Sequence, residues 1–206
     1  MISNSDNTHR EYSSPIVYFF LILPYGISSG FLSVTLPYEL TKLGWSVAAI
    51  AALVAIGTSS NLWRFAWSPI VDLTLSTRTW YLIGLFPAAL AIGALGIVPL
   101  REGWFFTGLV FFSQVASTIV ILPVAGMIAH TVMETAQGRA SGWYQAGNLG
   151  GAGIGGGIGL WLATHSTYTI ACCFLALLML ACALALRWIP NVHPISGESI
   201  AIRRTV

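Results

Sequence analysis

Long apolar runs separated by short polar breaks dominate the chain. Uncharged stretches occupy positions 12–38, 43–63, 79–100, 103–133 and 140–186. Each is long enough for the roughly 20 apolar residues of a membrane-spanning helix, and the last is long enough for two. Within that last stretch, the small and polar residues at 164–167 predict a tight turn. The pattern therefore predicts six transmembrane helices.

The expected fold is all-α and polytopic. The predicted helices cover positions 16–36, 45–66, 80–99, 104–129, 142–163 and 168–188. Short loops join them, so that the membrane domain extends over 16–188. Residues 1–15 are expected to form an N-terminal tail, and residues 189–206 a C-terminal tail.

Composition supports the lipid bilayer as the environment of the chain. Charged residues make up 8% of the sequence, against about 25% in soluble domains. The mean hydropathy is +0.78. The three cysteines, Cys172, Cys173 and Cys182, fall within the sixth predicted helix and behave there as small apolar residues. The four histidines are dispersed over different loops, so neither a metal site nor a cofactor is predicted.

The basic residues predict the orientation. In the six-helix arrangement one side carries Arg10, Arg64, Arg78, Arg139, Arg187, Arg203 and Arg204, and the other carries Lys42 and Arg101. Because Lys and Arg concentrate on the cytoplasmic side, both termini are expected in the cytoplasm and the protein in the cell membrane. The net charge of +2 is small and dispersed, so nucleic acid is not an expected partner.

Four residues single out the loop between the second and third predicted helices: Trp67, Pro69, Asp72 and Arg78. Asp72 lies at the membrane edge, where a helix N-terminus or an arginine stabilises a carboxylate. A simpler interpretation remains open: Asp72 and Arg78 mark a solvated loop, and Arg64 extends to the lipid headgroups.

This loop resembles the signature loop of the major facilitator superfamily, in which a small residue stands four positions before an aspartate, as Ser68 does before Asp72. The Trp-x-Pro-x-x-Asp form, made here by Trp67, Pro69 and Asp72, is similar to the branch of muropeptide permeases and acetyl-coenzyme A transporters. Leu73 occupies a position where the family usually has arginine, and Arg78 follows later than the family pattern.

The resemblance implies the N-terminal six-helix half of a transporter that usually has twelve spans in two halves, with residues 189–206 resembling a truncated central linker on the cytoplasmic side. It implies that Asp72 and Arg78 belong to a latch that holds one of two alternating conformations. It also implies a substrate site between two halves, and hence a homodimer or a separately encoded second half.

A glycine stripe marks the fifth predicted helix, which follows a junction that also resembles this family. Gly147, Gly151, Gly155 and Gly159 recur every fourth residue and therefore share one helix face. Small residues let neighbouring backbones approach closely in lipid, so the stripe predicts a helix contact. A second possibility is that the smooth face lets the helix slide during transport.

A few uncharged polar residues are candidates for a substrate cavity. They are Tyr18, Tyr25 and Ser29 in the first predicted helix, Gln114 and Thr118 in the fourth, and Gln145 and Asn148 in the fifth. Each set shares a helix face. Hydrogen bonds between helices are the alternative role for each of them.

These features favour transport of a small solute by alternating access. A non-transporting six-span subunit or a truncated, inactive relative is the alternative. An intramembrane serine protease, with Ser141 as nucleophile and His165 as base, is disfavoured because the fifth helix separates them by about 36 Å. The protein is therefore not expected to be an enzyme.

Overall fold

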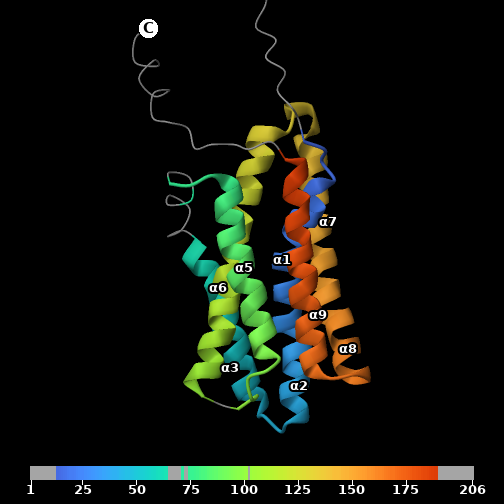
Figure 1. The fold of residues 1–206 in the computed structure, drawn as a ribbon. Coiled ribbons are helices and arrows are strands. Elements are labelled where there is room, and N and C mark those ends of the chain that lie inside the picture. The colour runs from blue at the N-terminus through green and yellow to red at the C-terminus, as the bar shows by residue number, and fades with distance from the viewer. Residues whose placement is uncertain (1–12, 65–70, 72–73, 102, 190–206) are drawn as a thin grey trace, which may run out of the picture.

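The computed structural model describes residues 13–64, 71, 74–101 and 103–189. Within these residues every regular element is a helix, and Figure 1 shows the helices running along one long axis. In chain order the elements are α1 (Val17–Gly30), η1 (Phe31–Thr35), α2 (Leu36–Lys42), α3 (Val47–Thr58), η2 (Ser59–Trp63), α5 (Thr77–Leu95), α6 (Trp104–Thr131), α7 (Glu134–Gly153), η3 (Ile154–Ile158), α8 (Gly159–His165), α9 (Tyr168–Ala181) and η4 (Cys182–Trp188).

Several of these elements join end to end into longer rods. Four rods are long and apolar enough to cross a membrane: Val17–Lys42, Thr77–Leu95, Trp104–Thr131 and Tyr168–Trp188. They coincide with four of the six predicted spans. The second predicted span coincides with the shorter apolar helix Val47–Trp63, and the fifth lies within α7, η3 and α8. The structure therefore shows four membrane-capable helices, and a six-span topology stays a prediction.

The first helix continues beyond the predicted end at residue 36. Pro37 lies in the first turn of α2, and the π-helical segment η1 directly precedes it. Proline lacks the N–H that an α-helix would use and crowds the preceding turn. The wider π turn accommodates the proline without ending the rod.

Hydroxyl side chains cap the N-termini of three helices. Ser46 Oγ accepts a hydrogen bond from the Ala49 N–H at 3.1 Å, and Ser76 Oγ accepts one from the Thr79 N–H at 3.2 Å. Thr167 caps α9 in the same way. Each cap satisfies a backbone donor that the first helical turn leaves free. The predicted turn at 164–167 thus contains both the end of α8 and the cap of α9.

The rod formed by α1, η1 and α2 is the centre of the bundle. Of its most apolar window 67% is buried, against 39% for Tyr168–Trp188. α1 packs against α6, α7 and α9, and its inward residues Leu21 and Ile27 are fully buried. Large apolar side chains such as Leu90 and Leu177 remain exposed on the outer helices, as a lipid-facing surface requires.

Candidate functional site

A close helix contact joins α1 to the rod of α7, η3 and α8. A Cβ atom added at Gly151 would lie 2.6 Å from the Leu23 carbonyl oxygen and 2.9 Å from Gly26 Cα. Gly147 and Gly155 face the α1 carbonyl groups of Phe19 and Ile27 even more closely. Backbone therefore meets backbone along this face, with no room for a side chain.

The fourth glycine of the stripe lies beside η1. A Cβ at Gly159 would lie 2.7 Å from Thr35 Oγ1. The Thr35 hydroxyl donates to the Gly155 carbonyl at 2.8 Å and also lies 3.2 Å from the Gly156 carbonyl. Both carbonyls belong to η3, so a buried hydroxyl from one π-helical segment hydrogen-bonds to the other.

Next to this contact, half-buried polar side chains from three elements lie close together. The Tyr25 hydroxyl of α1 donates to Asn61 Oδ1 of η2 at 3.1 Å. Tyr25 and Arg64 both lie close enough to the Tyr144 hydroxyl of α7 to interact with it electrostatically. We call Tyr25, Ser29, Asn61, Arg64, Tyr144 and Asn148 the polar face; all six are half-buried.

Ser29 and Asn148 extend the polar face along two helices. Ser29 follows Tyr25 by one helical turn, and Asn148 follows Tyr144 by one turn. Three of the predicted cavity residues, Tyr25, Ser29 and Asn148, therefore belong to the polar face. Polar groups that are neither buried nor in water are costly in lipid, so this face requires an aqueous or protein surface opposite it.

The other predicted cavity residues lie elsewhere. Gln114 is buried in α6, and its amide donates to Ser28 Oγ at 2.9 Å, which links α6 to α1. Thr118 is buried and donates to the Val115 carbonyl of its own helix. Gln145 is exposed. The structure thus places Gln114 and Thr118 inside the bundle, where helix-to-helix and intrahelical bonds satisfy them.

Tyr18 belongs to a separate cluster at the end where α1 begins. Its hydroxyl lies 2.6 Å from both Ser13 Oγ and Thr131 Oγ1, and those two hydroxyls lie 2.9 Å apart. Tyr18 is fully buried. The cluster fixes the start of α1 to the end of α6, and it does not include Tyr25.

Arg78 is the described member of the predicted gate loop. Its Nη2 donates to the Ile189 carbonyl, just beyond η4, which joins the starting end of α5 to the chain at the end of η4. Arg78 Nε is buried and has no hydrogen-bond partner within the described part of the chain. Trp67, Pro69 and Asp72 lie outside the described residues, so the latch stays a prediction.

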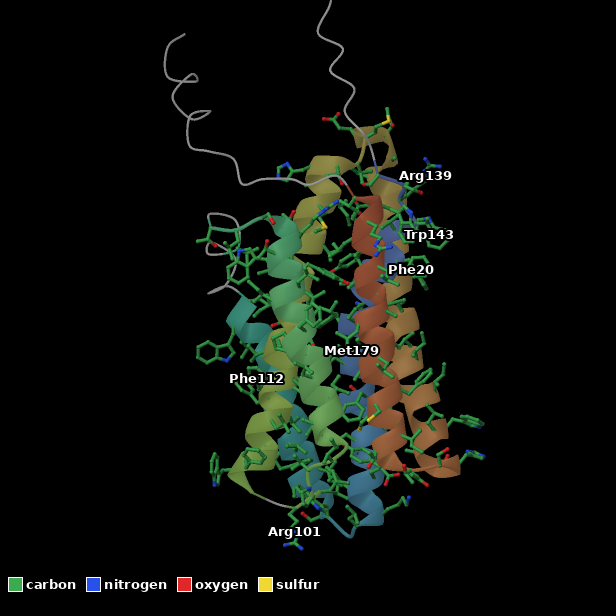
Figure 2. All side chains as sticks on the ribbon, viewed as in Figure 1. Phe20, Arg101, Phe112, Arg139, Trp143 and Met179 are labelled. Atoms are coloured by element: carbon green, nitrogen blue, oxygen red, sulfur yellow. The ribbon has the colours of Figure 1, made fainter. Side chains whose placement is uncertain are left out.

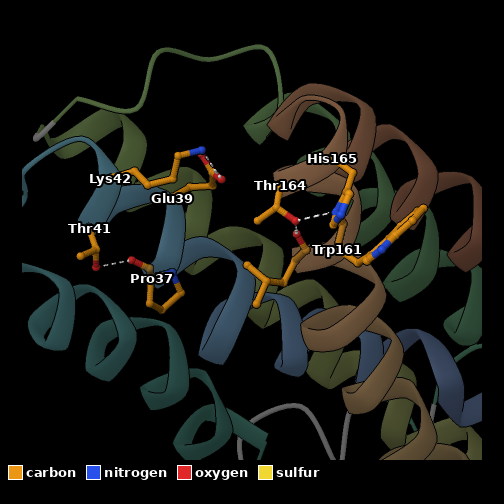
Figure 3. Close-up of polar contacts among 8 residues, drawn as sticks. Pro37, Glu39, Thr41, Lys42, Trp161, Thr164 and His165 are labelled. Carbon is orange, nitrogen blue, oxygen red and sulfur yellow. Dashed lines mark hydrogen bonds and ion pairs between the residues drawn. The ribbon is translucent and has the colours of Figure 1, made fainter.

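The opposite end of the bundle carries its own polar contacts (Figure 3). Lys42 forms an ion pair with Glu39 at 3.3 Å. The His165 ring stacks on Trp161 and has Nδ1 3.0 Å from Thr164 Oγ1. These contacts lie in the last turns of α2 and α8. His165 therefore caps a helix end, far along the rod from Ser141, as the sequence predicts.

Sequence reasoning missed Asn61, Arg64 and Tyr144. Asn61 and Arg64 stand three positions apart in an apolar run, so they share a helix face, and this spacing was the available signal. Arg64 was instead interpreted as a topology marker at the headgroups. Tyr144 carried no signal, because an aromatic residue near a membrane boundary is common.

The geometry, with its apolar exterior and its half-buried polar face, is compatible with a membrane transporter. No curated protein matches the chain. The family model of the Major Facilitator Superfamily matches residues 18–204, which is most of the chain. The match and the four membrane-capable helices identify a multi-pass membrane protein. The chain therefore belongs to the major facilitator superfamily, a family of membrane transporters of small solutes.

Proposed function

We propose that this protein moves a small solute across the cell membrane by alternating access, and that the polar face lines the solute's path. The observation that carries the proposal is the set of half-buried polar groups contributed by α1, α7 and the end of η2, in a bundle that exposes many large apolar side chains. In lipid such groups would each cost on the order of 1 kcal/mol or more. A water-filled path removes that cost.

A six-helix half would also include the two rods that are not among the four membrane-capable helices. The helix Val47–Trp63 and the rod of α7, η3 and α8 lie alongside the four membrane-capable helices and supply part of the polar face. Val47–Trp63 is apolar but shorter than the four membrane-capable helices, and the polar groups and glycines of α7 lower the hydropathy of its rod. Transport sites commonly form between repeats near the bilayer midplane. A second six-helix unit, either another copy or a separate half, is the surface that the polar face requires.

Alternatives to this assembly predict a different outcome in detergent. A non-transporting subunit or an inactive relative would be monomeric and would show no uptake after reconstitution. A homodimer with uptake supports the proposed assembly. Uptake by a proven monomer would contradict it.

The accessibility of Ser29 tests the proposed path. In a variant whose three cysteines are replaced by alanine, Ser29→Cys should react with a membrane-impermeant maleimide added to either side of oriented vesicles. Leu149→Cys is the control, because Leu149 is 73% exposed on the apolar exterior next to Asn148. It should react from neither side. If Ser29→Cys reacts with the maleimide from neither side, an aqueous path at the polar face is rejected.

A further inference from the structure

Arg64 carries a positive charge that the described residues do not neutralise. The described part of the chain contains an ion pair between Glu39 and Lys42, at the other end of the rod that holds Tyr25. Arg64 has no hydrogen bond or ion pair there, although it is half-buried beside Tyr144. A guanidinium group has five N–H donors and no acceptor, and none of the five is bonded to a residue of the described ranges.

Among the described residues, the neighbours of Arg64 on the polar face add donors and no negative charge. The amide of Asn61 is held in place by two bonds, since its Oδ1 accepts from Tyr25 and its Nδ2 donates to the Thr58 carbonyl at 3.1 Å. One amide N–H therefore stays available. The half-buried Tyr144 hydroxyl is a further donor. Donors gathered around an arginine favour a carboxylate or a phosphate group.

The depth of this group favours a soluble ligand over a lipid headgroup. Tyr25 is eight residues into α1, about 12 Å along the helix axis. Tyr144 is ten residues into α7, about 15 Å along it. Both helices start at the same end, because Ser13 and Thr131 hydrogen-bond there. Counted from the predicted starts of the spans at residues 16 and 142, Tyr25 lies inside the hydrocarbon core of about 30 Å and Tyr144 lies near its edge, so the group extends inward from the membrane boundary.

From these observations we propose that Arg64, with Asn61 and Tyr144, binds the oxyanion of a soluble substrate, so that the transported solute carries a carboxylate or a phosphate group. This inference rests on the proposed function and names the substrate class. Arg64 supplies the positive charge and a bidentate hydrogen bond to the oxyanion. Asn61, positioned by Tyr25, and Tyr144 supply single hydrogen bonds to the same group.

Thermal unfolding in a nonionic detergent tests the binding step at constant ionic strength. Succinate and inorganic phosphate are the probes, and succinamide is the neutral control. A ligand that binds the folded state raises the Tm in a saturable way. We expect both anions, but not succinamide, to raise the Tm of the wild-type protein.

The variants locate the effect. Arg64→Gln should weaken anion binding about tenfold or more, and Arg64→Lys should restore it in part, because lysine keeps the charge but not the paired contact. Arg139→Gln is the matched control, since Arg139 is an exposed arginine on α7. Its affinity should equal that of the wild type. No shift in the wild type, or an equal shift in Arg64→Gln, would overturn the proposal.

Two further experiments distinguish a lipid phosphate from a soluble anion, and failure of the anion site from failure of the proposed transport. Phosphatidylglycerol supplies a lipid phosphate; a shift with this lipid and none with the soluble anions would overturn a soluble substrate. Uptake of labelled succinate and phosphate into proteoliposomes addresses transport itself. Arg64-dependent binding without uptake supports the anion site while rejecting transport by this assembly. Uptake of neutral solutes that these anions do not inhibit would reject the anion site alone.

Discussion

At the scale of single residues, the glycines of α7 and η3 control how near α1 can lie. The added Cβ at Gly151 would overlap the Leu23 carbonyl, whereas a Cβ at Gly153 meets nothing within 4 Å. The two glycines are two positions apart in one helix and differ in their surroundings. They therefore separate the effect of the contact from the intrinsic effect of glycine on a helix.

Gly151→Ala should destabilise the protein by about 1–3 kcal/mol, because the methyl group forces the two backbones apart. Gly153→Ala should be neutral, or stabilising by up to about 1 kcal/mol, because alanine favours the helix. Thermal unfolding in detergent compares them. Equal effects at both positions would show that the contact does not depend on the absence of a side chain.

The buried hydroxyl cluster of Ser13, Tyr18 and Thr131 permits a second residue-level test. Tyr18→Phe keeps the ring but removes two hydrogen bonds, so the stability should fall by about 1–2 kcal/mol. Tyr38→Phe is the control, because Tyr38 is exposed at the other end of the rod. A Tm unchanged by Tyr18→Phe, measured beside this control, would show that the cluster contributes little.

At the scale of elements, the paired π-helical segments η1 and η3 distinguish the central contact from ordinary helix packing. Wider π turns leave main-chain groups poorly matched within their own helix. Thr35 compensates by donating to a carbonyl of η3. One side chain thus satisfies a main-chain group of the opposite element.

Thr35→Val preserves the shape and removes the hydroxyl. We expect a loss of about 1–3 kcal/mol, because the Gly155 carbonyl loses its donor in a buried site. Thr41→Val is the matched control: its hydroxyl donates to the Pro37 carbonyl within its own helix and is exposed. The two variants should therefore differ clearly in Tm. A smaller effect at position 35 than at position 41 would contradict this account.

The elements also show what the sequence could and could not predict. Uncharged runs placed four membrane-capable helices, because a bilayer imposes length and apolarity directly. The π turn before Pro37 was not predictable, since proline there reads equally well as a helix end. The proximity of Arg64 to Tyr144 was not predictable, because a charge near the end of an apolar run gives no information about which helices lie opposite it.

At the scale of the whole molecule, the basic residues separate along the bundle axis. Figure 2 shows Arg101 at one end and Arg139 toward the other. Lys42 is the last residue of α2, which lies at the Arg101 end of the bundle. This separation along the long axis supports our proposal that the Arg139 end faces the cytoplasm.

Cysteine labelling from each side tests that orientation. Gly138 and Gly103 are exposed, and a Cβ at either position meets nothing within 4 Å, so cysteine should be tolerated at both. An impermeant maleimide should label Gly138→Cys from the cytoplasm and Gly103→Cys from outside. The reverse result would invert the orientation and leave the fold unchanged.

The glycine contact also bears on how this protein could change its substrate during evolution. Packing residues and residues of the proposed path occupy adjacent positions: Gly26 follows Tyr25, and Gly147 precedes Asn148. Main-chain contacts hold α1 and α7 in register, so this packing does not depend on the side chains next to the glycines. Replacing Asn148 should therefore alter selectivity without loosening the contact between α1 and α7, so new specificities are reachable by single substitutions.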